Sequence, residues 1–69
     1  MVYQYSYVVL YRTDEILPAD PPLAFMCKAD HSCHAAEQCQ NAYPGCDVEW
    51  IVETDDVQSA YYDYWGIYS

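Results

Sequence analysis

Apolar and polar residues alternate along residues 46–54, CDVEWIVET, and this pattern predicts a strand with one buried face. Successive side chains of a pleated strand point in opposite directions, so Val48, Trp50 and Val52 would share the buried face. Asp47, Glu49 and Glu53 would then stand in a row on the other face. Neighbouring carboxylates in such a row are about 6–7 Å apart, which is also about the spacing of nucleic-acid phosphates.

The remaining patterns predict two more strands and two helices. Residues 2–12 are rich in Tyr and Val and predict a first strand that is partly apolar on both faces. Residues 13–22 hold three prolines and three acids, and they predict an irregular loop. A second strand is expected over residues 23–29. A first helix would follow, capped by Asp30 or Ser32 and running to about Tyr43; a second would be capped by Asp55 and end near Gly66.

These elements predict a single α+β domain over residues 1–69, with the element order β-β-α-β-α. A right-handed crossover through the first helix leaves space for the first strand between the other two, antiparallel to both. The expected fold is a three-stranded, split β-α-β sheet with both helices on the face that holds Trp50. The opposite face of the sheet would then be uncovered.

Strand-one tyrosines would lie on that uncovered face, beside the carboxylates of the third strand. Tyrosine suits surfaces that are both wet and adhesive, so a partner-binding patch is predicted there. A homodimer through the same open face is an alternative. The other alternative is that the tyrosine face is itself the core. The residues concerned are Tyr3, Tyr5, Tyr7 and Tyr11.

The charge of the chain narrows the class of partner. Its 69 residues carry a formal charge of −9, with only Arg12 and Lys28 as cations. Such a field opposes binding to nucleic acid or to an anionic membrane and favours a basic protein surface. Carboxylates could block that surface by mimicking phosphates, or they could simply solvate the domain. Besides Asp47, Glu49 and Glu53, the acids predicted to contact the partner are Asp14, Glu15, Asp20, Asp55, Asp56 and Asp63.

A cluster of cysteines and histidines offers a different class of function, a small zinc-binding or thiol redox module. Zinc sites usually pair ligands two to four residues apart, but here the cysteine gaps are five, five and six residues. Free thiols are therefore favoured over a metal site or a disulfide. The residues of this cluster are Cys27, His31, Cys33, His34, Cys39 and Cys46.

No catalytic arrangement is predicted. Cys33 and His34 are adjacent on the expected helix and would project about 100° apart, whereas a nucleophile and its base must meet. Neither a phosphate-binding glycine loop nor a cofactor site is expected in a chain with two glycines. The first residues lack the basic start and cleavage site of a targeting segment, which favours the cytoplasm.

The run from the HAAEQ helix through the NAYPG turn to the V-x-W-x-V strand resembles short acidic proteins of tailed bacteriophages. This resemblance covers roughly the last two thirds of the chain and includes no catalytic signature. It implies an interaction protein made during infection, acting in the cytoplasm of the host cell. Small phage proteins of this kind commonly inhibit nucleases, restriction enzymes, CRISPR effectors or polymerases.

Overall fold

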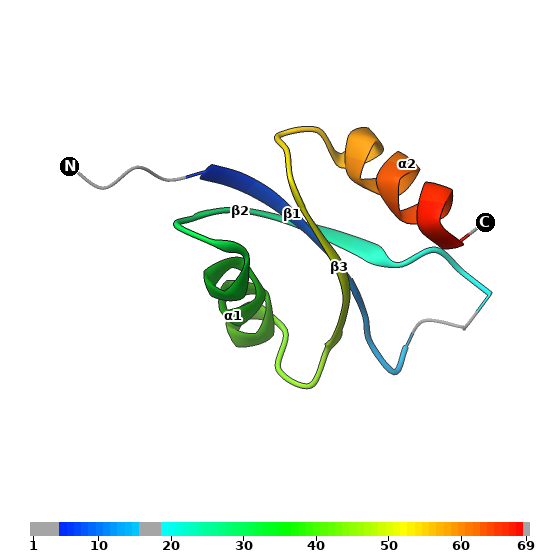
Figure 1. The fold of residues 1–69 in the computed structure, drawn as a ribbon. Coiled ribbons are helices and arrows are strands. Elements are labelled where there is room, and N and C mark those ends of the chain that lie inside the picture. Colours follow the sequence, from blue (N-terminus) through cyan, green and yellow to red (C-terminus); the bar gives the residue numbers. More distant parts are fainter. Residues whose placement is uncertain (1–4, 16–18, 69) are drawn as a thin grey trace.

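The computed structural model describes residues 5–15 and 19–68 and has the element order predicted from the sequence (Figure 1). Three strands and two helices alternate as β-β-α-β-α, so the predicted α+β class is confirmed. The elements are β1 (Tyr5–Arg12), β2 (Leu23–Ala29), α1 (Ser32–Ala42), β3 (Asp47–Glu53) and α2 (Val57–Tyr68). The second strand has the predicted bounds, and the third is shorter than predicted by one residue at each end.

The strands pair in the order β2-β1-β3, with β1 antiparallel to both neighbours, as predicted. Five consecutive residues of β1, from Tyr7 to Tyr11, are buried. A run that is apolar on both faces is typical of a central strand. The composition of residues 7–11 thus explains why β1 lies in the middle of the sheet.

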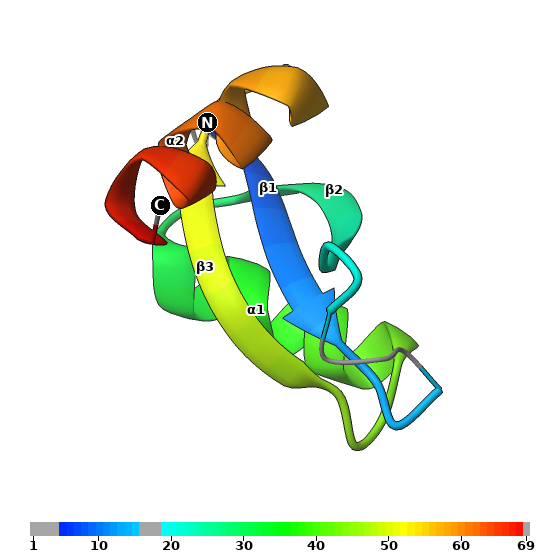
Figure 2. The same cartoon turned by 90° about the vertical axis from the view of Figure 1, so that its right-hand side faces the viewer.

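The two helices cover opposite faces of the sheet (Figures 1 and 2). The prediction that both lie on one face is wrong. The physical reason is β1, whose residues 7–11 are apolar on both faces of the sheet, so that each face needs a helix to cover it. We call the two clusters the α1-side core and the α2-side core. The first is built on Tyr7, Val9 and Tyr11, with Ala29, Ala35, Cys39 and Cys46; the second is built on Val8 and Leu10, with Ala60 and Tyr64.

A β-bulge at Glu49 changes which side chains of β3 share a face. Leu10 pairs with Trp50, but the next residue of β1, Tyr11, pairs with Val48, so Glu49 is the extra residue. Trp50 therefore packs on the α2-side core, whereas Val48 packs on the α1-side core. The predicted continuous face of Val48, Trp50 and Val52 is wrong for this reason, although Trp50 does contact a core as expected.

Both helices begin at residues other than those predicted. His31 is the N-cap of α1, and its Nδ1 accepts a hydrogen bond from the backbone N–H of His34 at 3.2 Å. At α2, Asp56 rather than Asp55 is the cap. Its two carboxylate oxygens accept from the Gln58 N–H at 3.1 Å and from the Ser59 hydroxyl at 3.0 Å. Gly66 does not end α2, which continues to Tyr68.

The cap assignment predicts different effects for two adjacent aspartates. Replacing Asp56 with alanine should lower the free energy of unfolding by about 1 kcal/mol, because two donors at the start of α2 lose their acceptor. Asp55→Ala removes the same charge without removing a cap, so its effect should be a few tenths of a kcal/mol at most. Urea unfolding followed by circular dichroism measures both. Equal losses would contradict the assignment.

Candidate protein-binding surface

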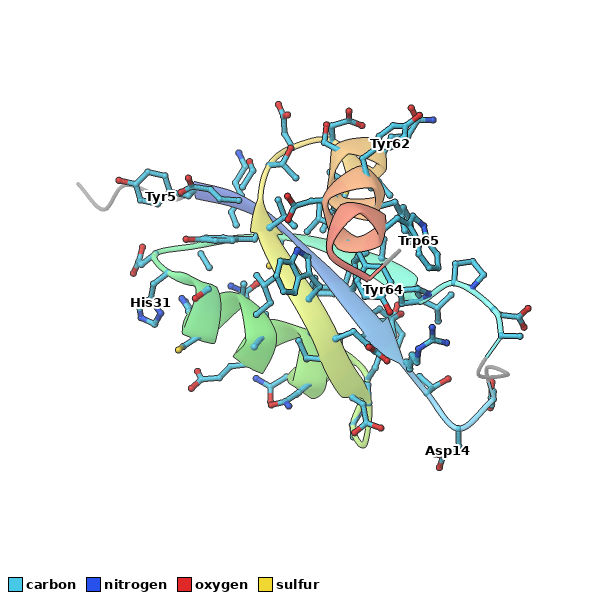
Figure 3. All side chains as sticks on the ribbon, turned by 45° about the vertical axis from the view of Figure 1, so that its right-hand side comes forward. Tyr5, Asp14, His31, Tyr62, Tyr64 and Trp65 are labelled. Atoms are coloured by element: carbon cyan, nitrogen blue, oxygen red, sulfur yellow. The ribbon has the colours of Figure 1, made fainter. Side chains whose placement is uncertain are left out.

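The outward side of α2 carries the most exposed large aromatic side chain of the described residues. Tyr62 is 77% exposed and Trp65 is 44% exposed. Both project from the helix toward solvent (Figure 3). With Gln58 and Tyr61 they line a hollow of about 180 Å³. We call these four residues the aromatic face of α2. Exposed Tyr and Trp clusters of this kind are enriched where proteins bind one another.

Contacts beneath the aromatic face hold two of its rings, those of Tyr61 and Trp65. The Tyr61 hydroxyl donates a hydrogen bond to the carbonyl oxygen of Pro22 in the loop before β2. Trp65 packs edge-on against Tyr64, with ring centroids 5.0 Å apart, and Tyr64 is itself buried in the α2-side core. A partner would therefore meet two aromatic rings that are already held in place, which lowers the entropy cost of binding.

A hydrogen bond between β3 and α2 fixes how the helix lies on the sheet. Trp50 Nε1 donates to Asp63 Oδ2 at 2.7 Å. Because the acceptor is a carboxylate, this bond belongs to the stronger, charge-assisted class. Asp63 was predicted as a partner-binding acid, and the structure gives it a role in holding α2 in place.

The predicted row of carboxylates on β3 is not formed. Asp47 pairs with Arg12 and Glu53 pairs with Tyr7, and these two β1 residues lie on opposite faces of the sheet. Glu49, at the bulge, is held by Arg12, whose Nε lies 2.7 Å from Glu49 Oε1. The phosphate-like spacing expected of a regular strand is lost because the bulge breaks the alternation.

The other predicted acids divide between the two ends of the sheet. Asp14 and Glu15 follow β1 directly and line a pocket of about 420 Å³ together with the α1–β3 turn. Asp20 is exposed in the loop before β2, where its carbonyl oxygen accepts a 2.7 Å hydrogen bond from Arg12. Asp55 and Asp56 lie at the opposite end, between β3 and α2. The acids therefore form a dispersed field and no single row.

The strand-one tyrosines do not form an exposed patch. Tyr7 and Tyr11 are 9% and 4% exposed because α1 covers their face of the sheet, so the prediction of an open tyrosine face is wrong. The alternative interpretation, that this face is core, holds for both residues. Tyr5 is half exposed at the start of β1, and Tyr3 lies outside the described residues. With α1 on this face, the expected open surface for a homodimer is also absent.

Burial beneath α1 changes the acidity of two groups in the α1-side core. Tyr11 stacks on Tyr43 with ring centroids 4.9 Å apart, and burial, aided by the Tyr43 hydroxyl, raises the pKa of Tyr11 to about 12. Burial also raises the pKa of Cys39 to about 12, with a smaller contribution from its hydrogen bond to Cys46. Both groups are neutral when protonated, so the folded state holds their protons more tightly than the unfolded chain.

The direction of these shifts predicts a loss of stability at high pH. The contribution of the two groups should be complete below the ordinary pKa of a cysteine, 9.0, and should disappear as the pH rises toward about 12. Urea midpoints measured from pH 8 to pH 11 should therefore fall, and Cys39→Ala should reduce the fall between the ordinary cysteine and tyrosine values of 9.0 and 10.0. A midpoint that stays constant over this range would contradict the prediction.

The structure divides the predicted Cys/His cluster: Cys27 packs against the α1-side core near Cys39 and Cys46, whereas the two histidines and Cys33 lie at or near the start of α1. His31 caps α1, Cys33 is exposed on that helix, and Cys39 and Cys46 are buried in the α1-side core. Within residues 5–15 and 19–68, no three His, Cys, Asp or Glu side chains converge where they could hold a metal ion. The four cysteines are free thiols in this structure.

Comparison of the chain with protein-family models, with curated proteins and with solved structures gives no significant match. The resemblance to phage proteins therefore stays a prediction. In the part of the chain that the structure describes, neither helix has the length and apolar character needed to cross a membrane. The candidate site consequently rests on the surface of the molecule alone.

Sequence reasoning missed Tyr62 and Trp65 as site residues. The apolar stripe of α2 that faces the sheet consists of Val57, Ala60 and Tyr64, and Tyr61 lies at its edge, partly buried against the α2-side core and partly lining the hollow. Tyr62 and Trp65 fall outside this stripe on the helix surface. Large aromatic residues on the otherwise polar side of an amphipathic helix were the signal that could have identified them.

Proposed function

We propose that this chain is a small acidic inhibitor that binds a basic, nucleic-acid-handling host protein, as the resemblance to phage proteins implies. The observation that carries the proposal is the exposed aromatic face of α2 on a domain with a charge of −9. The negative field attracts a basic surface at long range, and the rings supply the contact area that becomes desolvated on binding. Such an inhibitor would act in the cytoplasm of the infected cell.

The excess of acidic over basic side chains in the domain supports a basic partner. All eleven acids and both basic side chains lie within the described residues. An ion pair joins Arg12 to Glu49, and two cations against eleven acids leave most of the negative charge without a cation of this chain. Partner cations near the aromatic rings would gain both carboxylate and cation–π interactions.

The proposal does not depend on phosphate mimicry. The row of Asp47, Glu49 and Glu53 that suggested it is divided between faces and partly neutralised. A dispersed acidic field still favours the sites on partner proteins that have evolved to bind phosphates, because those sites are basic. Competition by nucleic acid is thus expected through the shared partner surface, without a matched spacing of charges.

A capture experiment tests this function. The tagged chain is incubated with bacterial lysate, and bound proteins are eluted in parallel with duplex DNA and with buffer. The control bait is Tyr62→Ala with Trp65→Ala, which has the same charge but lacks the two exposed rings. We expect a basic nucleic-acid-binding protein that the wild-type bait retains, the control bait loses and DNA displaces. Equal retention by both baits, or no retained protein, would contradict the proposal.

A further inference from the structure

Two buried cysteines lie side by side where α1 is followed by β3. Cys39 Sγ and Cys46 Sγ are 3.9 Å apart. Cys39 is on the sheet-facing side of α1 and is fully buried; Cys46 immediately precedes β3 and is 7% exposed. A disulfide needs an S–S distance of about 2.05 Å, so the sulfurs must approach by about 2 Å.

The backbone of the α1–β3 turn positions these cysteines independently of their side chains. The Tyr43 N–H donates to the Cys39 carbonyl oxygen at 2.9 Å, and the Cys46 N–H donates to the Tyr43 carbonyl oxygen at 3.1 Å. Gly45 has φ of +87°, a conformation that residues with a side chain rarely adopt, and it turns the chain back toward the helix. The short distance between the sulfurs is therefore a consequence of the turn.

One of the two cysteines borders a pocket at the surface. Cys46 lines the pocket of about 420 Å³ whose other walls are residues 13–15 and 42–45. Cys39 lies behind it in the α1-side core. A small oxidant that entered this pocket would meet Cys46 first, with Cys39 adjacent to it.

We propose that Cys39 and Cys46 form a redox-sensitive dithiol site that a peroxide converts to a disulfide. The sulfur of Cys46 attacks one peroxide oxygen; the O–O bond breaks, the second oxygen leaves as water, and Cys46 becomes a sulfenic acid. The sulfur of Cys39 then attacks the sulfur of Cys46, the S–O bond breaks and a second water leaves. In total two thiols are oxidised by two electrons and one peroxide is reduced to two waters.

The order of the two steps follows from the surroundings of each thiol. The thiolate is the reactive form of cysteine, and the raised pKa of Cys39 keeps that residue protonated near neutral pH. Cys39 is therefore a poor first nucleophile. It acts in the second step because its sulfur lies 3.9 Å from that of Cys46, and because this attack also requires the Cys39 thiolate, the cross-link should form faster as the pH rises. The resulting bond would join the last turn of α1 to the start of β3. This site is independent of the aromatic face of α2 and of the proposed function.

Mass spectrometry of the peroxide-treated protein tests the proposal. After treatment with hydrogen peroxide in native buffer and alkylation, the wild-type chain should have lost two hydrogens and should carry two alkyl groups instead of four. Peptide mapping should assign the cross-link to Cys39 and Cys46, at least about tenfold over any other pairing, because reactivity follows position in the fold. In urea this preference should disappear.

Matched cysteine variants identify each role. Cys33→Ser and Cys27→Ser should still form the cross-link, whereas Cys39→Ser should instead accumulate a sulfenic acid at Cys46 that dimedone labels. The wild-type mapping needs no variant, so it decides the matter even if Cys39→Ser fails to fold. A native cross-link that involves Cys27 or Cys33, or four thiols that remain free after treatment, would overturn the proposal.

Discussion

Replacing Leu10 with alanine should leave most of the chain unfolded at room temperature. Leu10 is fully buried at the centre of β1, and it pairs with Ala24 on one neighbouring strand and Trp50 on the other. Leucine-to-alanine changes at such positions cost about 3–5 kcal/mol, through lost burial and the cavity that remains. A domain of this size, without a metal or disulfide, has about 3–5 kcal/mol of stability in total.

The appropriate control is Leu23→Ala, the same change on the adjacent strand. Leu23 is 43% exposed at the start of β2, so its truncation should cost less than about 1.5 kcal/mol. Far-ultraviolet circular dichroism and urea titration of both variants measure the difference. A Leu10→Ala protein with a urea midpoint close to that of Leu23→Ala would show that the α2-side core does not hold the fold together.

Local residue patterns were sufficient to predict the strands and their order. Residues 7–11 are apolar on both faces, which favours a central position, and Pro44-Gly45 marks the turn into β3. These features act over a few residues, so they can be interpreted without tertiary information. The β2-β1-β3 order then followed from the handedness of the crossover through α1.

Local patterns could not predict which side chains of β3 lie on which face of the sheet. Alternation along residues 46–54 is interrupted at Ile51, but this residue alone does not distinguish a regular strand from one with a bulge at Glu49. The bulge is favoured by tertiary contacts: Arg12 binds the Glu49 carboxylate, and Trp50 bonds to Asp63 on α2. Such contacts join residues 13 or more positions apart, and they override local pattern.

The same limitation applied to the binding surface. The sequence predicts an open patch of β1 tyrosines, but α1 covers the face of the sheet that holds Tyr7 and Tyr11. Because α1 and α2 cover opposite faces of the sheet, Tyr7 and Tyr11 are buried in the core. The exposed aromatic area lies on α2, at Tyr62 and Trp65. The composition predicts an aromatic, acidic surface. The arrangement of the helices determines where on the molecule the exposed aromatic residues lie.

The second large effect concerns the affinity for a captured partner. Tyr62→Ala together with Trp65→Ala should weaken binding at least about a hundredfold, because exposed Tyr and Trp at the centre of an interface commonly contribute 2 kcal/mol or more each. Both residues are exposed, and alanine favours the helix, so α2 should remain folded. Calorimetric titration measures the affinity, and circular dichroism verifies the fold. Tyr5→Ala, at a half-exposed tyrosine distant from α2, is the matched control and should have little effect.

Salt dependence separates the contribution of the rings from that of the charges. Changing Glu53 to Gln and Asp55 to Asn leaves the aromatic face intact but removes two negative charges from the end of the sheet where α2 begins. This variant should associate more slowly and lose part of the salt dependence, because rim charges act mainly on the rate of encounter. The variant without the two rings should instead dissociate faster and keep the wild-type salt dependence. If the ring variant bound as tightly as the wild type while the charge variant failed to bind, the interface would be electrostatic and the aromatic face of α2 would lie outside it.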